Sequence, residues 1–177
     1  MKVLKITIVL IMWMCYPIMI YGQHLDIGNI KSSLNQMMPQ MIKEHQSLVS
    51  IPNDSNYPED MDKNVSWIKE AYEKRGYKVS VLETETIPVI FCEYKVSEDL
   101  PTILFYIHYD GQPVDPSEWD QEDPFVPVIR NESGALVSYD NISQWNDDWR
   151  IYARAAADDK APIMMMLYAS DLMKQHN

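Results

Sequence analysis

Two short groups of polar residues carry side chains that could do chemistry. His108 and Asp110 end an apolar run, and residues two apart on a strand point the same way. Binding sites in open α/β sheets form just outside the carboxyl ends of strands. An imidazole there can bind a metal ion, and a neighbouring carboxylate can orient its ring. A histidine at a strand end more often has a purely structural role, so this pair alone is a weak signal.

The second group is the run Asp158-Asp159-Lys160. Aspartate favours the start of a helix, where its carboxylate accepts hydrogen bonds from free backbone amides and meets the positive end of the helix dipole. The run can therefore be an N-cap followed by a charged first turn. The alternative is that one carboxylate leaves the cap and bridges two cations.

Apolar residues at helical spacing predict the helices that would position these groups. The first two cover residues 33–51 and 59–74, with Pro39 as a break or restart within the first. The third follows Asp158 and has Pro162 in its first turn. Its wide apolar face needs partners on more than one side. That face comprises Ile163, Met164, Met165, Met166, Leu167 and Met173.

Strand-like runs lie between the second and third helices. They cover residues 77–82, 89–94, 102–109 and 150–154. Residues 103–107 of the third run are apolar without alternation, which predicts a strand buried on both faces. Helices that alternate with buried strands indicate an α/β sandwich.

The composition excludes several classes of protein. The chain has 177 residues and a mass of 20.7 kDa, which is one domain or a piece of a larger one. Its net charge of -11, with no basic run, argues against nucleic acid as a partner. A hydrophobic fraction of 46% excludes a fully disordered chain. Two cysteines, Cys15 and Cys92, cannot form a disulfide-rich framework.

The N-terminus has the pattern of a secretory signal peptide. Lys2 and Lys5 precede an apolar run over residues 6–20, and the small residue Gly22 follows it. The run is short for a membrane span, which needs about 20 apolar residues. We expect residues 1–22 to be removed on export to the periplasm or the extracellular space, with no stable membrane contact afterwards. An uncleaved N-terminal anchor is the alternative.

Taken in order, the polar groups and their flanks resemble one family. The residues are 106–116 (YIHYDGQPVDP), Trp119, 123–127 (DPFVP) and 154–160 (RAAADDK). They are similar to the pattern H-x-D-x-x-P-V-D, W, P-F-x-P and R-G-x-x-D-D/N-K-G. This is the pattern of the di-zinc metallopeptidases that include carnosinase, aminoacylase, carboxypeptidase G and succinyl-diaminopimelate desuccinylase. The resemblance covers nearly all of residues 23–177 and is strongest to the dipeptidase branch.

The resemblance implies the fold and a role for each site residue. The fold would be a three-layer α/β/α zinc-peptidase catalytic domain, incomplete at the C-terminus, with residues 23–177 as its N-terminal part. His108 would bind one zinc ion, with Asp110 behind it as the catalytic residue that orients the ring. Asp158 would bridge both metals, with a cis peptide bond after it. Lys160 matches the motif and is expected to be structural.

The implied reaction is metal-assisted hydrolysis of the amide bond of a small peptide. Two Zn²⁺ ions, or Mn²⁺ or Co²⁺, would activate a water, and a glutamate would take its proton. Since two metals about 3.5–4 Å apart must be bridged, His108 and Asp158 should lie no more than about 8 Å apart.

The chain also departs from the family pattern. Ala155 and Ala161 replace two glycines, and extra residues precede Arg154. The adjacent Glu-Glu pair, the last ligands and the inserted domain through which family members often dimerise do not occur before Asn177. We therefore expect a truncated, inactive fragment of an exported peptidase. The alternative is a non-catalytic secreted binding or assembly module that retains half of the fold.

Overall fold

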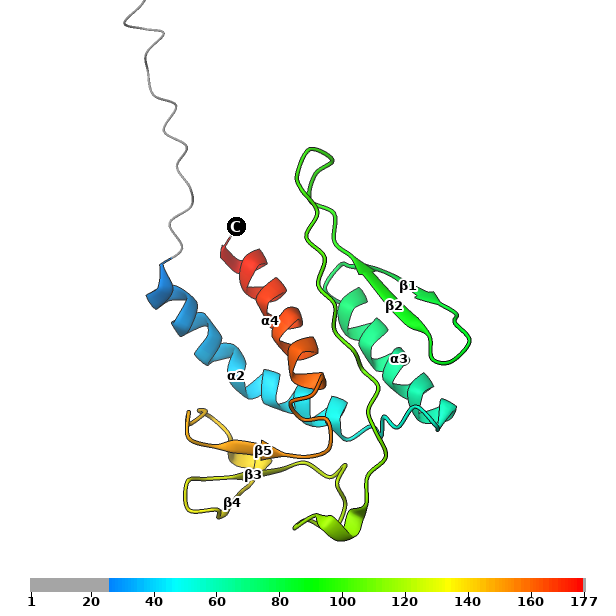
Figure 1. Cartoon of the computed structure of the whole chain (residues 1–177). Helices are drawn as coiled ribbons and strands as arrows, with labels where there is room; N and C mark the ends of the chain where they lie inside the picture. The colour runs from blue at the N-terminus through cyan, green and yellow to red at the C-terminus, as the bar shows by residue number, and fades with distance from the viewer. Residues whose placement is uncertain (1–25, 177) are drawn as a thin grey trace, which may run out of the picture.

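The structure is a computed structural model that describes residues 26–176 of the chain. It contains three long helices and two small antiparallel sheets (Figure 1). The expected signal peptide, residues 1–22, lies outside the described residues. Within 26–176, no helix has both the length and the hydropathy that a membrane span requires. The elements are α2 (Ile27–Val49), α3 (Pro58–Glu73), β1 (Lys78–Leu82), β2 (Val89–Glu93), β3 (Val128–Arg130), β4 (Leu136–Val137), β5 (Arg150–Tyr152) and α4 (Lys160–His176), with short 3-10 turns at Pro116–Glu118 and Tyr139–Asn141.

The three predicted helices are present, and the first is longer than predicted. Helix α2 begins at Ile27, where Asp26 caps it by accepting a 2.8 Å hydrogen bond from the amide of Gly28. It continues through Pro39, so the predicted break there is wrong. A helix interior can absorb one lost hydrogen bond when packing of its apolar face supplies most of its stability, and α2 packs along α4.

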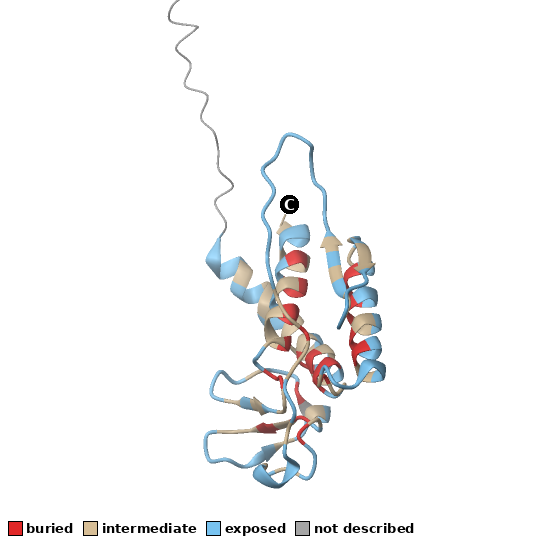
Figure 2. Cartoon of the chain, turned by 45° about the vertical axis from the view of Figure 1, so that its right-hand side comes forward, coloured by how far each residue is buried: buried red, intermediate tan, exposed pale blue. Residues whose placement is uncertain are grey.

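The main core lies where the three helices and the β1–β2 hairpin face one another (Figure 2). Leu48 of α2, Met61 of α3 and Leu167 of α4 are among its fully buried side chains. The hairpin covers α3, and its strands pair from Lys78 opposite Glu93 to Leu82 opposite Val89. This core determines how α2 and α4 sit against each other.

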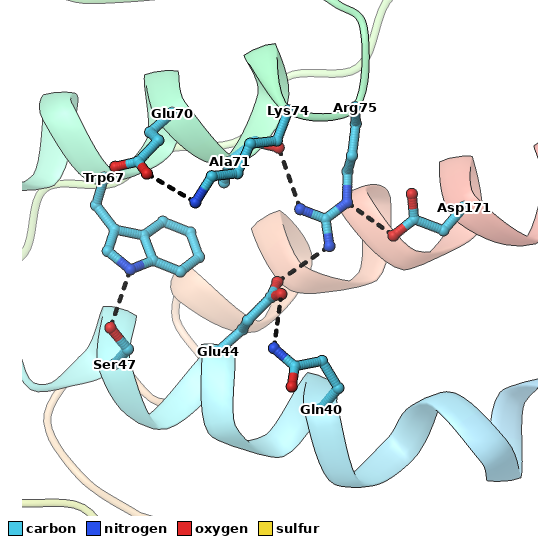
Figure 3. Close-up of polar contacts among 9 residues, drawn as sticks. All are labelled: Gln40, Glu44, Ser47, Trp67, Glu70, Ala71, Lys74, Arg75 and Asp171. Atoms are coloured by element: carbon cyan, nitrogen blue, oxygen red, sulfur yellow. Dashed lines mark hydrogen bonds and ion pairs between the residues drawn. The ribbon is translucent and has the colours of Figure 1, made fainter.

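Arg75, just after α3, links the three helices through charged hydrogen bonds (Figure 3). Its Nε donates to Oδ2 of Asp171 in α4 at 2.7 Å, and its Nη2 donates to Oε2 of Glu44 in α2 at 3.0 Å. Its Nη1 donates to the carbonyl oxygen of Ala71 at 3.1 Å. Only 11% of the arginine side chain is exposed, so these bonds are largely shielded from water.

A second, smaller core lies under the three-stranded sheet. In this sheet β3 is central, with Ile129 opposite Val137 of β4 and opposite Ile151 of β5. Ile129 is fully buried and packs with Ile42 of α2. The three-stranded sheet therefore packs on α2 and is separate from the β1–β2 hairpin.

The prediction of a doubly buried strand at residues 102–109 is wrong. Residues 102–107 are extended but make no backbone hydrogen bond to any other described residue. Ile103, Leu104 and Tyr106 are 75%, 81% and 88% exposed. The apolar run needs paired strands on both sides to be buried, and no strand within residues 26–176 pairs with it. The chain enters the core only at Ile107, ahead of the polar groups.

Candidate metal centre

His108 and Asp158 meet at the surface of the molecule. Nε2 of His108 lies 2.9 Å from Oδ1 of Asp158, although the two residues are 50 positions apart. The side chains are 38% and 89% exposed, so the pair is accessible to solvent. The convergence predicted from the sequence is present, well inside the limit of about 8 Å set by two bridged metals.

The other ring nitrogen of His108 contacts Asp110. Nδ1 lies 2.9 Å from the backbone carbonyl oxygen of Asp110 and 3.4 Å from its Oδ1. A carbonyl oxygen can only accept, so Nδ1 carries the proton and donates it. The carboxylate oxygen of Asp158 can also only accept, so Nε2 is protonated and donates to it, and a metal ion binding at Nε2 would replace that proton. Asp110 thus lies behind His108, as predicted, but the shorter contact is with its backbone carbonyl rather than its carboxylate.

Asp159 also reaches the histidine, and sequence reasoning gave it no role of its own. Its Oδ2 accepts a 3.1 Å hydrogen bond from the backbone amide of His108. His108, Asp158 and Asp159 each offer one potential ligand atom, and the three atoms lie within 4.8 Å of one another. The available signal was the doubling of aspartate at this point of the sequence.

The turn before α4 brings both carboxylates to His108. Residues 153–159 form turns, with Ala155 in the left-handed region at a φ of 60°, and α4 begins only at Lys160. The peptide bond between Asp158 and Asp159 is cis, as the resemblance implies. The N-cap interpretation is wrong, because the hydrogen bonds of both carboxylates among the described residues go to His108 and not to amides of α4.

The charges around His108 favour a cation. Partial burial lowers the pKa of the imidazole. The hydrogen bonds to the Asp110 carbonyl and Asp158, with the charges of Asp159 and Asp110, outweigh that effect and raise the pKa above its usual value. An imidazole facing three carboxylates binds either a proton or a metal ion at Nε2.

Lys160 lies beneath the pair and not in it. The side chain is fully buried, in agreement with the structural role expected for it. Burial lowers the pKa of its ammonium group to about 7. Two cavities of about 780 and 770 Å³ lie elsewhere, beside the acidic loop at 120–124 and between α2 and residues 143–148. The candidate centre is an open surface position, since the side chains of His108 and Asp158 are partly and largely exposed.

Two solved structures share this fold. The chain is 32% identical to an M20 family metallo-carboxypeptidase from Sulfolobus solfataricus over 77% of its own length, with a TM-score of 0.59. It is 21% identical to the di-peptidase Dug1p from Saccharomyces cerevisiae over 83% of its length, with a TM-score of 0.62. It spans only 28% and 30% of those two chains. No protein-family model matches the chain, and no curated protein matches it in sequence.

These likenesses show the fold of the chain. The mixed helix and strand fold is that of part of an M20 peptidase domain, which confirms the fold class predicted from the sequence. The metallo-carboxypeptidase, at 32% identity, supports placement of the chain in the M20 peptidase superfamily. Among the described residues, His108, Asp158 and Asp159 form a group that could hold a metal ion.

Proposed function

We propose that the chain is the N-terminal part of a metal-dependent peptidase of the dipeptidase branch. The observation that carries this proposal is the 2.9 Å approach of His108 Nε2 to Asp158 Oδ1, at the two positions where the motifs require metal ligands. The substrate class would be small peptides, cleaved at the amide bond.

The side chains present suit a divalent metal. Imidazole nitrogen and carboxylate oxygen are ligands for Zn²⁺ and, with more oxygen, for Mn²⁺. When bound, two such ions polarise the scissile carbonyl and lower the pKa of a shared water. His108 would bind a metal through Nε2 in place of the proton that it donates to Asp158, because the Asp110 carbonyl holds the other proton on Nδ1. Asp158 has a largely exposed carboxylate, which would be accessible to a metal ion bound at His108.

The remaining residues of the cluster set the ligand geometry. Asp159 accepts from the His108 amide and so fixes the backbone beside the ligand. Catalytic zinc takes three protein ligands per ion, and this cluster offers three for two ions. We propose that the missing ligands and the glutamate base come from polypeptide outside these 177 residues.

We expect weak zinc binding that depends on His108. Isothermal titration of the purified chain with Zn²⁺ at pH 7.5, a value about one unit above the usual histidine pKa, should show binding that His108→Ala removes. His176→Ala is the matched control, because His176 is the last residue of α4 and its hydrogen bond is to Ser33, near the start of α2. Equal zinc affinity of the wild type and His108→Ala would contradict the proposed centre.

The same titration should depend on pH. The pKa of His108 is raised, so as the pH falls a proton begins to compete with zinc for Nε2 at a higher pH than it would at an ordinary histidine. The affinity for Zn²⁺ should therefore be highest above the raised pKa of His108 and should fall as the pH drops through that pKa. If the zinc affinity instead stayed the same down to pH 5, about 1.5 units below the usual histidine pKa, Nε2 of His108 would be excluded as a ligand.

We also propose export, on the pattern of residues 1–22. In a host that secretes the protein, N-terminal sequencing of the exported fraction should begin near Gln23. An intact Met1 in that fraction would contradict the proposal.

A non-catalytic binding or assembly module is the second candidate. The exposed apolar segment at residues 103–106 favours it, because such a segment can pair with another polypeptide. The coding sequence beyond Asn177 separates the two. An in-frame continuation with a Glu-Glu pair supports the peptidase, and a stop codon with a stable native mass near 20 kDa supports the module.

A further inference from the structure

The segment that carries His108 is attached to the turn after α2. The side chain of Asn53 is fully buried, and its Nδ2 donates to the carbonyl oxygen of Tyr109 at 2.9 Å. The carbonyl oxygen of Asn53 accepts from the amide of Gly111 at 2.6 Å. A Cβ at position 111 would lie 2.8–3.0 Å from the Asn53 amide group, so only glycine allows this close approach. Both bonds hold the backbone just C-terminal to His108.

The turn that carries Asp158 is attached to the same place. Nζ of Lys160 donates to the carbonyl oxygens of Leu48 at 2.9 Å and Ile51 at 2.6 Å. The Leu48 carbonyl belongs to the last turn of α2 and also accepts from the Ile51 amide, and Ile51 lies just after the helix, at the end where the helix dipole favours a cation. Nε2 of His45, also in α2, lies 2.9 Å from the carbonyl oxygen of Ala156.

We infer that Asn53 and Lys160 are positioning residues that hold His108 and Asp158 in register by fixing both to residues 48–53. This inference rests on the proposed function, since it assigns these residues to the metal centre proposed there. Neither side chain touches the ligand atoms, so each acts through the backbone of its own segment.

The surroundings leave few other restraints on that register. Residues 102–107, before His108, have no backbone hydrogen bonds to other described residues, and residues 153–159, before α4, are turns. Besides the direct contacts of His108 with Asp158 and Asp159, the two segments share the main core, which holds Tyr109 and Ile163, and the hydrogen bonds to residues 48–53. Displacement of either segment would separate the ligand atoms of His108 and Asp158, which must lie close together to bind a metal ion.

Asn64 provides a closely matched control. Like Asn53 it is fully buried, its Oδ1 has no partner among the described residues, and its Nδ2 donates to the same turn, at Pro52, with a 2.8 Å bond. Its second bond goes to Asp60 of its own helix, so it touches neither ligand segment. Loss of Asn64 should cost stability in the same way and leave the register of the ligands intact.

The test compares Asn53→Ala and Lys160→Met with Asn64→Ala. Co²⁺ affinity and visible spectrum are measured by titration of the full chain, and the fold of each variant is checked by circular dichroism. Residues that orient metal ligands typically change affinity by about 10–100-fold. We expect that loss, with an altered Co²⁺ spectrum, in Asn53→Ala and Lys160→Met and not in Asn64→Ala. Equal affinities in all three folded variants would overturn the inference.

A metal-free measurement separates this inference from the proposed function. Long-range ¹H–¹⁵N spectra of the His108 imidazole report its hydrogen bond to Asp158. The signals should shift in Asn53→Ala and Lys160→Met but not in Asn64→Ala, even if the wild type binds no Co²⁺. Unchanged signals in folded variants would reject the positioning role whether or not a metal binds.

A reciprocal measurement needs no variant, should Asn53→Ala and Lys160→Met fail to fold. Coupling between two sites is mutual, so Zn²⁺ at saturation should slow hydrogen exchange of the Gly111 amide, which is bonded to Asn53. An exchange rate that is the same with and without bound Zn²⁺ would overturn the inference.

Discussion

Purified chain with excess zinc or manganese should hydrolyse a panel of dipeptides no faster than the metal ions alone. Among the described residues only His108, Asp158 and Asp159 form a group that could hold a metal, and none of them is a free general base. Loss of a general base alone typically costs about 10²–10⁴-fold in rate. Too few ligands for two ions should also leave the water poorly activated.

The blank for this assay is the metal without protein, and the diagnostic variant is His108→Ala. Turnover above the blank that disappears in His108→Ala would mean that the site is completed within these residues or by a second copy of the chain. That result would overturn the proposal that the missing groups lie elsewhere. Turnover that survives His108→Ala would point to a contaminating peptidase.

Leu167→Ala should lower the free energy of unfolding by about 3–5 kcal/mol, the upper part of the range for a buried leucine. Leu167 is fully buried in α4 among core residues from α2 and α3, including Leu48 and Ile68. Close helix packing leaves such a cavity only partly filled after truncation. Since small domains are stable by about 5–15 kcal/mol, the variant should be near the limit of folding. Urea unfolding followed by circular dichroism measures the change.

Met165→Ala is the control on the same helix. Its side chain is 67% exposed, so the substitution should change the free energy of unfolding by less than about 0.5 kcal/mol. Similar losses in both variants would show that α4 does not pack on its Leu167 face in solution.

Local sequence patterns predicted most of the helices and several of the strands. The strands β1, β2 and β5 and the helices α3 and α4 occur close to their predicted positions. The apolar run at 102–109 was predicted as a buried strand because periodicity reports the environment that a segment needs. It does not report whether strands that could supply this environment are present, and among residues 26–176 they are not.

The residues of the site that belong to the sequence motifs could be predicted. His108 and Asp158 were found because their motifs occur in the right order. The role of Asn53 could not be predicted, since its contact with Tyr109 joins residues 56 positions apart and produces no periodic pattern in the sequence. Asp159 was missed for a related reason, because a doubled aspartate before a helix is also what an N-cap predicts.

The burial of Asn53 and Asn64 has a consequence for how the protein can be produced. Both asparagines begin an N-x-S sequon, Asn53-Asp54-Ser55 and Asn64-Val65-Ser66. In a eukaryotic secretory host, oligosaccharyltransferase reads such sequons while the chain is still unfolded. A glycan on either amide could not be accommodated where the side chain has no exposed surface, and at Asn53 it would occupy the nitrogen bonded to Tyr109. Glycosylation and folding would therefore compete for the same two side chains, and a bacterial host avoids that competition.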